Sequence, residues 1–220
     1  MVYVVGYDLV GLFLLDAAGV LVAVALGLIV FYFGGPYGSG CLILLLIFLV
    51  SSVLATKYGS EIKRKLALYE YNRGWENVLA NGIVPVLCVV ASPGGGLLGA
   101  YVGSLAAVTA DKFSSEIGVL GDAPRGLFDF KVVKRGRSGA MSVVGTFSSF
   151  DGGLLVGVAS YFLFFGMYDA WGVLLIACIG FLGSLVDSVV GVLENKGIGN
   201  KMTTNFVCAL TGAVLGYLFL

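Results

Sequence analysis

The chain has 220 residues, of which 59% are hydrophobic and 12% charged, and its 13 basic residues balance its 13 acidic residues. Soluble domains carry about 25% charged residues, so this composition excludes a water-soluble fold and predicts an all-α, polytopic membrane helix bundle. The chain has no histidine, which excludes His-based acid–base chemistry and histidine metal sites. We expect membrane lipid, and no nucleic acid, among its partners.

Seven apolar runs follow one another along the chain, at about residues 9–33, 40–56, 77–92, 95–113, 142–166, 170–193 and 203–220. A membrane-spanning helix needs about 20 apolar residues, so we expect about seven transmembrane helices in a single domain, residues 1–220. For the short third run, a re-entrant segment is the alternative. The 34 glycines fit this class because small residues let membrane helices approach closely. No basic region precedes the first run, which we therefore interpret as a mature span rather than a cleaved signal.

All 13 basic residues lie in, or at the edge of, the connections after the second, fourth and sixth runs. Cytoplasmic connections carry an excess of Lys and Arg, so the pattern predicts a cytoplasmic N-terminus and an external C-terminus. Residues 57–76 are polar and helix-prone, and we expect them to extend the second span or to form an interfacial helix.

Acidic residues lie within or at the ends of the apolar runs: Asp16, Asp111, Glu116, Asp151 and Asp187. Inserting an ionised group at the bilayer centre costs roughly 2.5–3.5 kcal/mol on insertion scales, so each of these acidic residues requires a structural or functional explanation. Neighbouring carboxylates repel one another unless a cation neutralises them, and Mg²⁺ prefers hard oxygen ligands. The alternative is that these side chains join helices by hydrogen bonds.

Helical spacing places three sets of polar residues on shared faces: Arg73, Asn77 and Asn81; Asp111 and Ser115; and Asp187, Gly191 and Glu194. The first set offers a cation and two amides to an anionic group. In the third set, Gly191 allows a close approach. Glu116 lies well around the helix from Asp111, so the two could meet one metal only where the helix ends or bends.

Residues 133–146 read VKRGRSGAMSVVGT, a basic stretch followed by small and hydroxyl residues at a predicted helix start. Backbone N–H groups at a helix start, with glycine and hydroxyl donors, can bind phosphate. The alternative is a positive-inside loop followed by a small-residue packing face. The segment is not a Walker A motif, and the chain lacks a Rossmann fingerprint, kinase signatures and a GxSxG elbow.

Several segments resemble the signature blocks of one membrane protein family, the domain-of-unknown-function 92 type, which contains plant phytyl-phosphate kinase. The segments are residues 72–82, residues 109–118, Pro124-Arg125 and residues 136–146, with Asp16 and Gly19, and Ser51-Ser52 with Thr56-Lys57, matching its early blocks. The resemblance runs in order over essentially the whole chain. The family is in turn distantly similar to CTP-using membrane lipid kinases and cytidylyltransferases.

The resemblance implies transfer of phosphate from a nucleoside triphosphate, often CTP, to an isoprenoid monophosphate of the phytyl or geranylgeranyl type, at the cytoplasmic face of the cell membrane. It implies Mg²⁺ held by the catalytic residues Asp111, Glu116 and Asp187. The residues that it implies around nucleotide and phosphate are Arg73, Asn77, Asn81, Ser115, Arg125, Arg137, Ser138, Gly139, Ser142, Thr146 and Asn205.

The sequence departs from the family pattern at two positions. Lys112 follows Asp111 where a small polar residue is common, and Lys201 stands in a stretch where an acidic residue is expected. Three alternatives to the kinase hypothesis remain: a cytidylyltransferase that makes a CDP-lipid, a transporter or channel for a small ion or lipid, and a structural helix bundle without activity.

Overall fold

Each of the seven apolar runs contains a helix in the computed structural model, which describes residues 14–70, 72–166 and 169–220. The helices are α2 (Ala17–Phe33), α3 (Gly38–Lys57), α5 (Trp75–Ala91), α6 (Leu98–Gly118), α7 (Val143–Ser160), α8 (Ala170–Glu194) and α9 (Lys201–Phe219). A 3₁₀ turn, η1 (Gly35–Tyr37), precedes α3, and a π turn, η2 (Tyr161–Phe165), follows α7. Residues 9–13 of the first predicted run lie outside the described residues.

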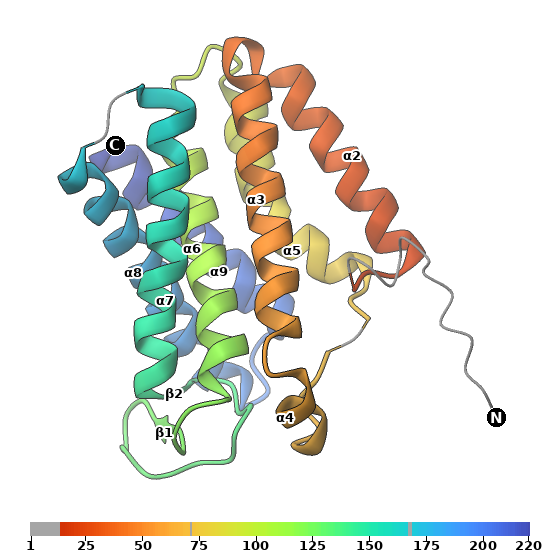
Figure 1. Cartoon of the computed structure of the whole chain (residues 1–220), viewed down its shortest axis with the longest axis vertical. Helices are drawn as coiled ribbons and strands as arrows, with labels where there is room; N and C mark the ends of the chain where they lie inside the picture. Colours follow the sequence, from red (N-terminus) through yellow and green to blue (C-terminus); the bar gives the residue numbers. More distant parts are fainter. Residues whose placement is uncertain (1–13, 71, 167–168) are drawn as a thin grey trace.

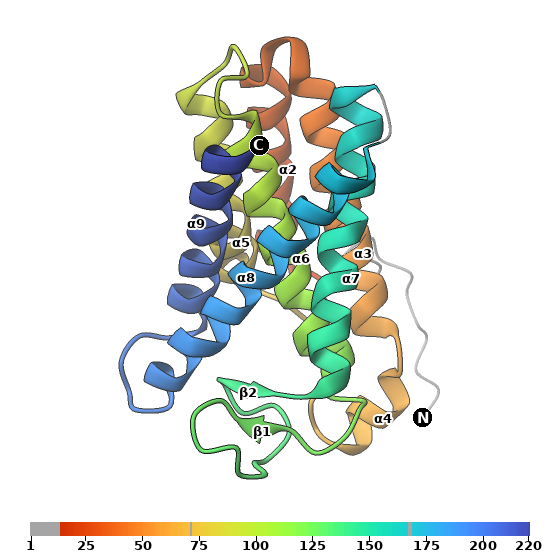
Figure 2. The ribbon, with the colours of Figure 1, turned by 90° about the vertical axis from the view of Figure 1, so that its left-hand side faces the viewer.

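Helix α6 forms the centre of the bundle and packs against α3, α5, α7, α8 and α9 (Figures 1 and 2). Its contacts with neighbours depend on small residues. A Cβ atom added to Gly103 of α6 would lie 2.2 Å from the backbone oxygen of Gly212 in α9. A Cβ on Gly152 of α7 would lie 2.8 Å from the Thr109 oxygen. The predicted use of glycine for close helix approach is therefore confirmed.

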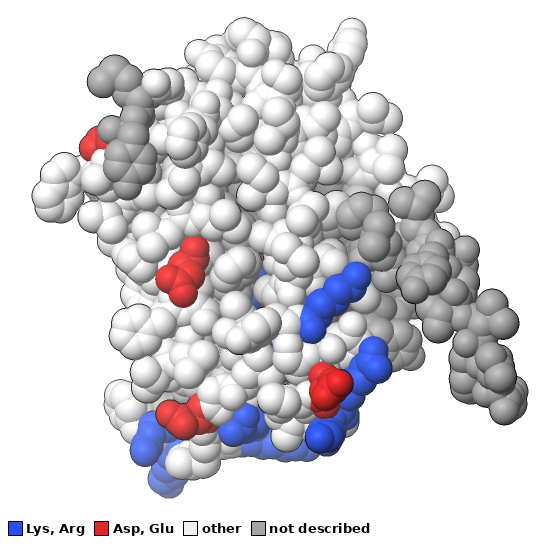
Figure 3. Space-filling model, viewed as in Figure 1, with Lys and Arg blue, Asp and Glu red and all other residues white. Residues whose placement is uncertain are grey.

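The outside of the bundle is apolar, as a membrane protein requires. Among the described residues, four helices are long and apolar enough to cross a membrane: α3 with η1, α7 with η2, α8 and α9. Helices α2 and α5 are apolar but shorter. Large hydrophobic side chains such as Leu21, Phe162 and Trp171 are exposed, and uncharged residues cover most of the face shown in Figure 3. The predicted all-α membrane bundle is confirmed.

Charged connections gather at one end of the bundle, which we call the basic end. It contains the short helix α4 (Ser60–Lys65), the strands β1 (Arg125–Gly126) and β2 (Ala140–Met141), which pair antiparallel, and the α8–α9 connection (Figures 1 and 2). Most of the Lys and Arg side chains visible in Figure 3 lie there. The turns that join α2 to α3 and α5 to α6 lie at the opposite end (Figure 1).

Two local expectations need correction. Asp16 is not inside a helix: it is the N-cap of α2, where its side chain accepts a hydrogen bond from the Gly19 N–H at 2.5 Å, and this use of Asp at a helix start is common. For residues 57–76 only the first of the two expectations is wrong: they do not continue α3 as one helix, and a separate short helix, α4, forms instead. Gly59 has a left-handed backbone (φ +64°) and separates α3 from α4.

Candidate functional site

A polar cavity of about 260 Å³ lies at the basic end of the bundle. Its walls come from the last turns of α6 and α8, the loop that leads into α7, and the start of α9. Of the residues predicted from sequence, it is lined by Asp111, Ser115, Glu116, Arg137, Ser138, Gly139, Ser142 and Asp187. The helix ends and the loop after β1 therefore bring together residues that are up to 76 positions apart (111 to 187).

Asp111 and Asp187 face the same ammonium group. The Lys201 Nζ lies 3.3 Å from Asp187 Oδ2 and 4.0 Å from Asp111 Oδ2. Both carboxylates are buried, whereas the Lys201 side chain is 47% exposed. The second oxygen of Asp187, Oδ1, is buried and has no hydrogen-bond partner among the described residues. This acidic pair therefore carries more negative charge than its one lysine offsets.

Glu116 belongs to a different cluster. Its Oε1 lies 2.6 Å from an Arg73 guanidinium nitrogen and accepts a hydrogen bond from the Thr56 hydroxyl at 2.8 Å, and its Oε2 lies 3.0 Å from the Lys63 Nζ. No group of three or more acidic, His or Cys side chains in the described part of the chain is placed to hold a metal. The predicted convergence of Glu116 with Asp111 and Asp187 on one ion is therefore wrong, because buried cations already pair with Glu116.

Lys63 holds α4 against the end of α3. Its fully buried ammonium donates to the backbone oxygens of Ala55 and Thr56, at 2.8 and 3.0 Å, as well as to Glu116. Cations stabilise helix C-termini because the last carbonyls there lack intrahelical partners. Sequence reasoning counted Lys63 only as a cytoplasmic charge, and no spacing rule signals that it folds back onto α3.

The loop before α7 presents small polar groups to the cavity. Ser138 donates to Glu194 at 2.8 Å, and the side chain of Asn195 donates to the Ser138 backbone oxygen. Gly139 packs against α8, where a Cβ on Gly191 would lie 2.8 Å from the Gly139 nitrogen. The predicted close approach at Gly191 is thus confirmed, and it fixes the loop beside the acidic pair.

Ser142 is the N-cap of α7, and its hydroxyl accepts the Gly145 N–H at 3.0 Å. The helix start that we predicted as a phosphate site therefore uses one of its own N–H groups for capping. Thr146 does not line the cavity: its hydroxyl donates to the Ser142 backbone oxygen.

Five other predicted site residues, and Asp151, do not line the polar cavity. Arg125 is exposed on β1 and donates to the Phe130 backbone oxygen at 3.0 Å. Asn205 is buried in α9. Asn77 and Asn81, together with Arg73, line a second and mainly apolar groove. Asp151, which we expected within a span, is exposed on α7.

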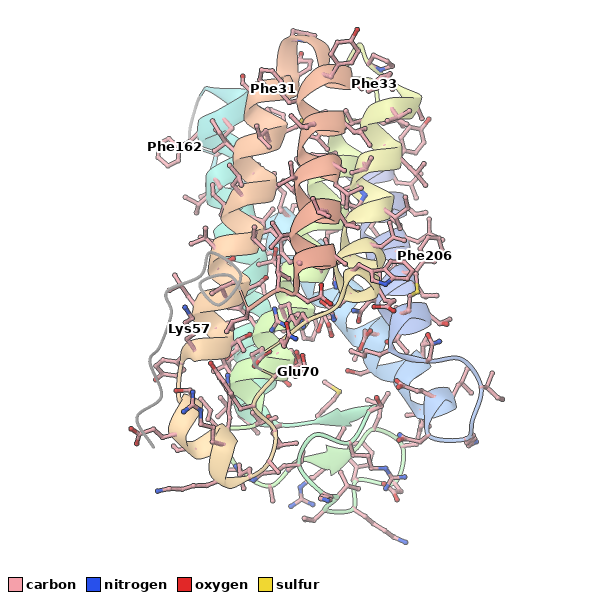
Figure 4. All side chains as sticks on the ribbon, turned by 90° about the vertical axis from the view of Figure 1, so that its right-hand side faces the viewer. Phe31, Phe33, Lys57, Glu70, Phe162 and Phe206 are labelled. Atoms are coloured by element: carbon pink, nitrogen blue, oxygen red, sulfur yellow. The ribbon has the colours of Figure 1, made fainter. Side chains whose placement is uncertain are left out.

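Lys112 and Glu70 are cavity residues that sequence reasoning did not assign to the site. Lys112 is only 6% exposed, and among the described residues its ammonium makes no hydrogen bond or ion pair. Figure 4 shows Glu70 where the α4–α5 loop passes the polar side chains of this region. The signal for Lys112 was present as a departure from the family pattern, next to Asp111.

Comparison with known proteins agrees with the membrane architecture. The chain is 39% identical over 209 residues to "Uncharacterized membrane protein MJ0933" of Methanocaldococcus jannaschii, covering 93% of this chain and 85% of that protein. It is 33% identical over 210 residues to "Protein PGR" of Arabidopsis thaliana, covering 80% and 70% of the two chains. A Synechocystis relative, "Uncharacterized membrane protein sll0875", is 30% identical over 168 residues, with 71% and 64% covered.

No solved structure shows significant similarity to the chain. The profile of the family described as "Integral membrane protein DUF92" matches residues 1–213, nearly the whole sequence. This match confirms the family resemblance deduced from the sequence blocks. The chain belongs to the DUF92 family of integral membrane proteins.

Proposed function

We propose that the protein is a Mg²⁺-dependent phosphotransferase that transfers a phosphate from a nucleoside triphosphate to an isoprenoid monophosphate. CTP is the favoured nucleotide. The observation that carries this proposal is the separation of charge in the polar cavity. Asp111 and Asp187 form an acidic wall, with the half-exposed Lys201 beside them, whereas Lys112, Arg137, Ser138 and Ser142 form a basic and polar wall. Glu116 and Glu70 also line the cavity, but Glu116 is paired with Arg73 and Lys63, and Glu70 is largely exposed. A triphosphate with its bound metal ion has matching charges.

The acidic wall suits a magnesium ion. Mg²⁺ in phosphate-handling sites is commonly bound by one or two carboxylates together with substrate phosphates, so a third carboxylate is not required. Asp111 and Asp187 would hold the ion, and the unpartnered Asp187 Oδ1 is an available ligand. When bound, Mg²⁺ neutralises charge on the phosphate oxygens that react.

The basic wall binds and orients the phosphates. Lys112 and Arg137 offset negative charge that spreads over the transferred group, and such positioning and electrostatic stabilisation carry most of the catalysis in phosphoryl transfer. The hydroxyls of Ser115, Ser138 and Ser142 donate within the protein, to the Lys112 backbone oxygen, Glu194 and the Gly118 backbone oxygen. Each would exchange that partner for a phosphate oxygen in order to orient the substrate, because a hydroxyl has one proton to donate. The attacking oxygen belongs to a phosphate that is already ionised, so the reaction does not require a histidine or another general base.

The membrane orientation follows from charge. We propose that all seven apolar helices span the bilayer, with the N-terminus in the cytoplasm, because the basic end contains the Lys- and Arg-rich connections. The polar cavity then opens at the cytoplasmic face, where nucleoside triphosphates are present. The lipid substrate reaches the same depth from the membrane.

The test is a product assay with the full chain in nanodiscs. Purified protein is incubated with labelled CTP or ATP, Mg²⁺ and geranylgeranyl or phytyl phosphate. Prenyl diphosphate with release of nucleoside diphosphate supports the kinase. A CDP-lipid with release of pyrophosphate identifies a cytidylyltransferase instead, and the absence of any labelled lipid product with every nucleotide contradicts both.

A further inference from the structure

A second cavity, which we call the apolar groove, lies between α2, α3 and α5 and has a volume of about 80 Å³. Its walls are mainly aliphatic, with Leu26 and Gly27 from α2, Leu45 and Leu49 from α3, and Val78 from α5. Figure 1 shows that α2 meets α3 at the end opposite the basic end and diverges from it toward the basic end. The groove is thus bounded by the outer helices of the bundle.

One end of the apolar groove is polar. Ser52, Arg73, Asn77, Asn81 and Lys112 line it there. The Ser52 hydroxyl and the Arg73 Nε are buried without hydrogen-bond partners in the described part of the chain, and the largely exposed Glu70 carboxylate lies 3.6 Å from the Arg73 Nε. Because buried polar groups normally have hydrogen-bond partners, these two groups are available to a polar ligand at this end.

Lys112 connects the two cavities, because it lines both the apolar groove and the polar cavity. It is about nine-tenths buried. Among the described residues no carboxylate lies within ion-pair distance of its ammonium, although those of Glu70 and Glu116 attract it from farther away. Nearby, the buried Lys63 and Arg73 share one buried carboxylate, Glu116. The second partner of Arg73, Glu70, has a side chain that is 62% exposed. Positive charge is therefore in excess where the groove meets the cavity.

We infer that the apolar groove holds the hydrocarbon chain of a single-chain lipid monophosphate, with its phosphate at Lys112. That this lipid is the phosphate acceptor rests on the proposed function; the binding itself does not. Along α3 the groove runs from Leu42 to Ser52, a length of about 15 Å at ~1.5 Å per residue. With about 80 Å³ of free volume along that length, the groove can hold one hydrocarbon chain only if part of the chain faces the membrane, and it has no room for the two chains of a diacyl phospholipid.

This assignment also explains the face formed by Arg73, Asn77 and Asn81. The three residues lie on the lipid side of Lys112, whereas Arg137 and Ser138 lie on the side of the polar cavity. An acceptor phosphate at Lys112 would therefore lie between its own hydrocarbon chain and the donor phosphates. The lipid substrate from the membrane and the water-soluble nucleotide would thus bind on different sides of Lys112, with their phosphates next to each other for the transfer.

Photo-crosslinking without nucleotide tests the groove. The probe is a geranylgeranyl phosphate analogue with a diazirine on its last isoprene unit, added to the full chain in phosphatidylcholine nanodiscs. We expect labelled peptides from α2, α3 and α5, with labelling that unlabelled geranylgeranyl phosphate displaces. Leu49→Trp fills the groove and should lower labelling about tenfold, since overpacking a filled site is unfavourable. Leu54→Trp, on the exposed side of the same helix, is the matched control.

The phosphate position is tested with Lys112→Met and Lys112→Arg. The wild type should prefer geranylgeranyl phosphate over geranylgeraniol. Lys112→Met should weaken phosphate binding by about 10- to 150-fold, because a charge-assisted hydrogen bond is lost, while Lys112→Arg retains most of it. Labelling that is equal in Leu49→Trp and Leu54→Trp, or equal displacement by phosphate and alcohol in the wild type, overturns the inference. Groove labelling in a protein without phosphotransfer contradicts the proposed function alone.

Discussion

The substitution Glu116→Gln tests the most strongly coupled cluster in the structure. Glu116 is the buried carboxylate shared by Arg73 at 2.6 Å and Lys63 at 3.0 Å, and the side chains of Glu116, Arg73 and Lys63 are 9%, 6% and 0% exposed. Gln preserves the size but removes the charge, and its amide N–H₂ must face a cationic donor. Removing one partner of a buried ion pair costs about 3–5 kcal/mol because the other charge stays buried. Here two cations lose the buried carboxylate that they share, although Arg73 keeps the exposed Glu70 and Lys63 keeps two backbone oxygens.

Thermal unfolding in detergent measures this effect. Labelling of the buried thiols of Cys41 and Cys208 by a thiol-reactive dye reports loss of the core. A loss of 3–5 kcal/mol corresponds to a Tm about 6–20 °C lower for a chain of this size. The control Glu61→Gln changes an exposed carboxylate of α4 and should change stability by less than about 0.5 kcal/mol.

The double variant Lys63→Met/Glu116→Gln and its two single variants form a double-mutant cycle, which measures the coupling between the two side chains. Because the double variant removes both a buried cation and its carboxylate, it should be more stable than the sum of the two single variants predicts, by roughly 1–3 kcal/mol. Glu116→Gln with a Tm within about 2 °C of the wild type, or strict additivity in the cycle, would refute the reasoning that buried charge pairing holds α4 to α6.

Three further predictions concern the acidic pair and the helix packing. Asp111→Asn or Asp187→Asn should lower phosphotransfer roughly 10³-fold without lowering Tm, since each removes one of two neighbouring like charges; a lower Tm contradicts this. Lys201→Met removes the cation that faces both carboxylates, so it should lower Tm in the absence of Mg²⁺ and enlarge the rise in Tm that Mg²⁺ produces. A rise no larger than that of the wild type argues against a metal between the carboxylates. Gly103→Ala should cost about 1–3 kcal/mol of stability, because its Cβ would lie 2.2 Å from a backbone oxygen of α9. The control Gly94→Ala, whose Cβ would have nothing within 4 Å, should have little effect. Equal Tm values for the two variants would contradict the close packing of α6 against α9.

The cavity divides its charge in a way that no single helix could produce. Asp111 and Lys112 are sequence neighbours on α6, so their side chains diverge by about 100° around the helix axis. Asp111 meets Asp187 and Lys201, whereas Lys112 reaches the groove between α2, α3 and α5. One turn of the central helix therefore supplies both the acidic and the basic wall.

Hydrophobicity determined the helices. The seven apolar runs contain α2, α3, α5, α6, α7, α8 and α9 with boundaries shifted by only a few residues, except that α2 starts later, α6 ends later, and α7 ends earlier, where η2 continues the run. The basic residues between the runs also predicted that the polar chemistry gathers at one end. These features depend on local composition and on chain direction reversing with each helix, so they can be read without knowing the tertiary contacts.

Tertiary structure decided which carboxylates share a site. The sequence analysis grouped Asp111, Glu116 and Asp187 around one ion, although Glu116 lies around the helix from Asp111. In the structure, α4 folds back and places Lys63 beside Glu116, while Asp187 and Lys201 come together only where α8 and α9 meet. Likewise, Asn77 and Asn81 were correctly placed on one face of a helix, whereas Arg73 precedes α5, which begins at Trp75. Only the packing of α2 and α3 shows that all three residues border an apolar groove. Side-chain pairing across helices depends on rotation and register between elements, which helical spacing within one element does not encode.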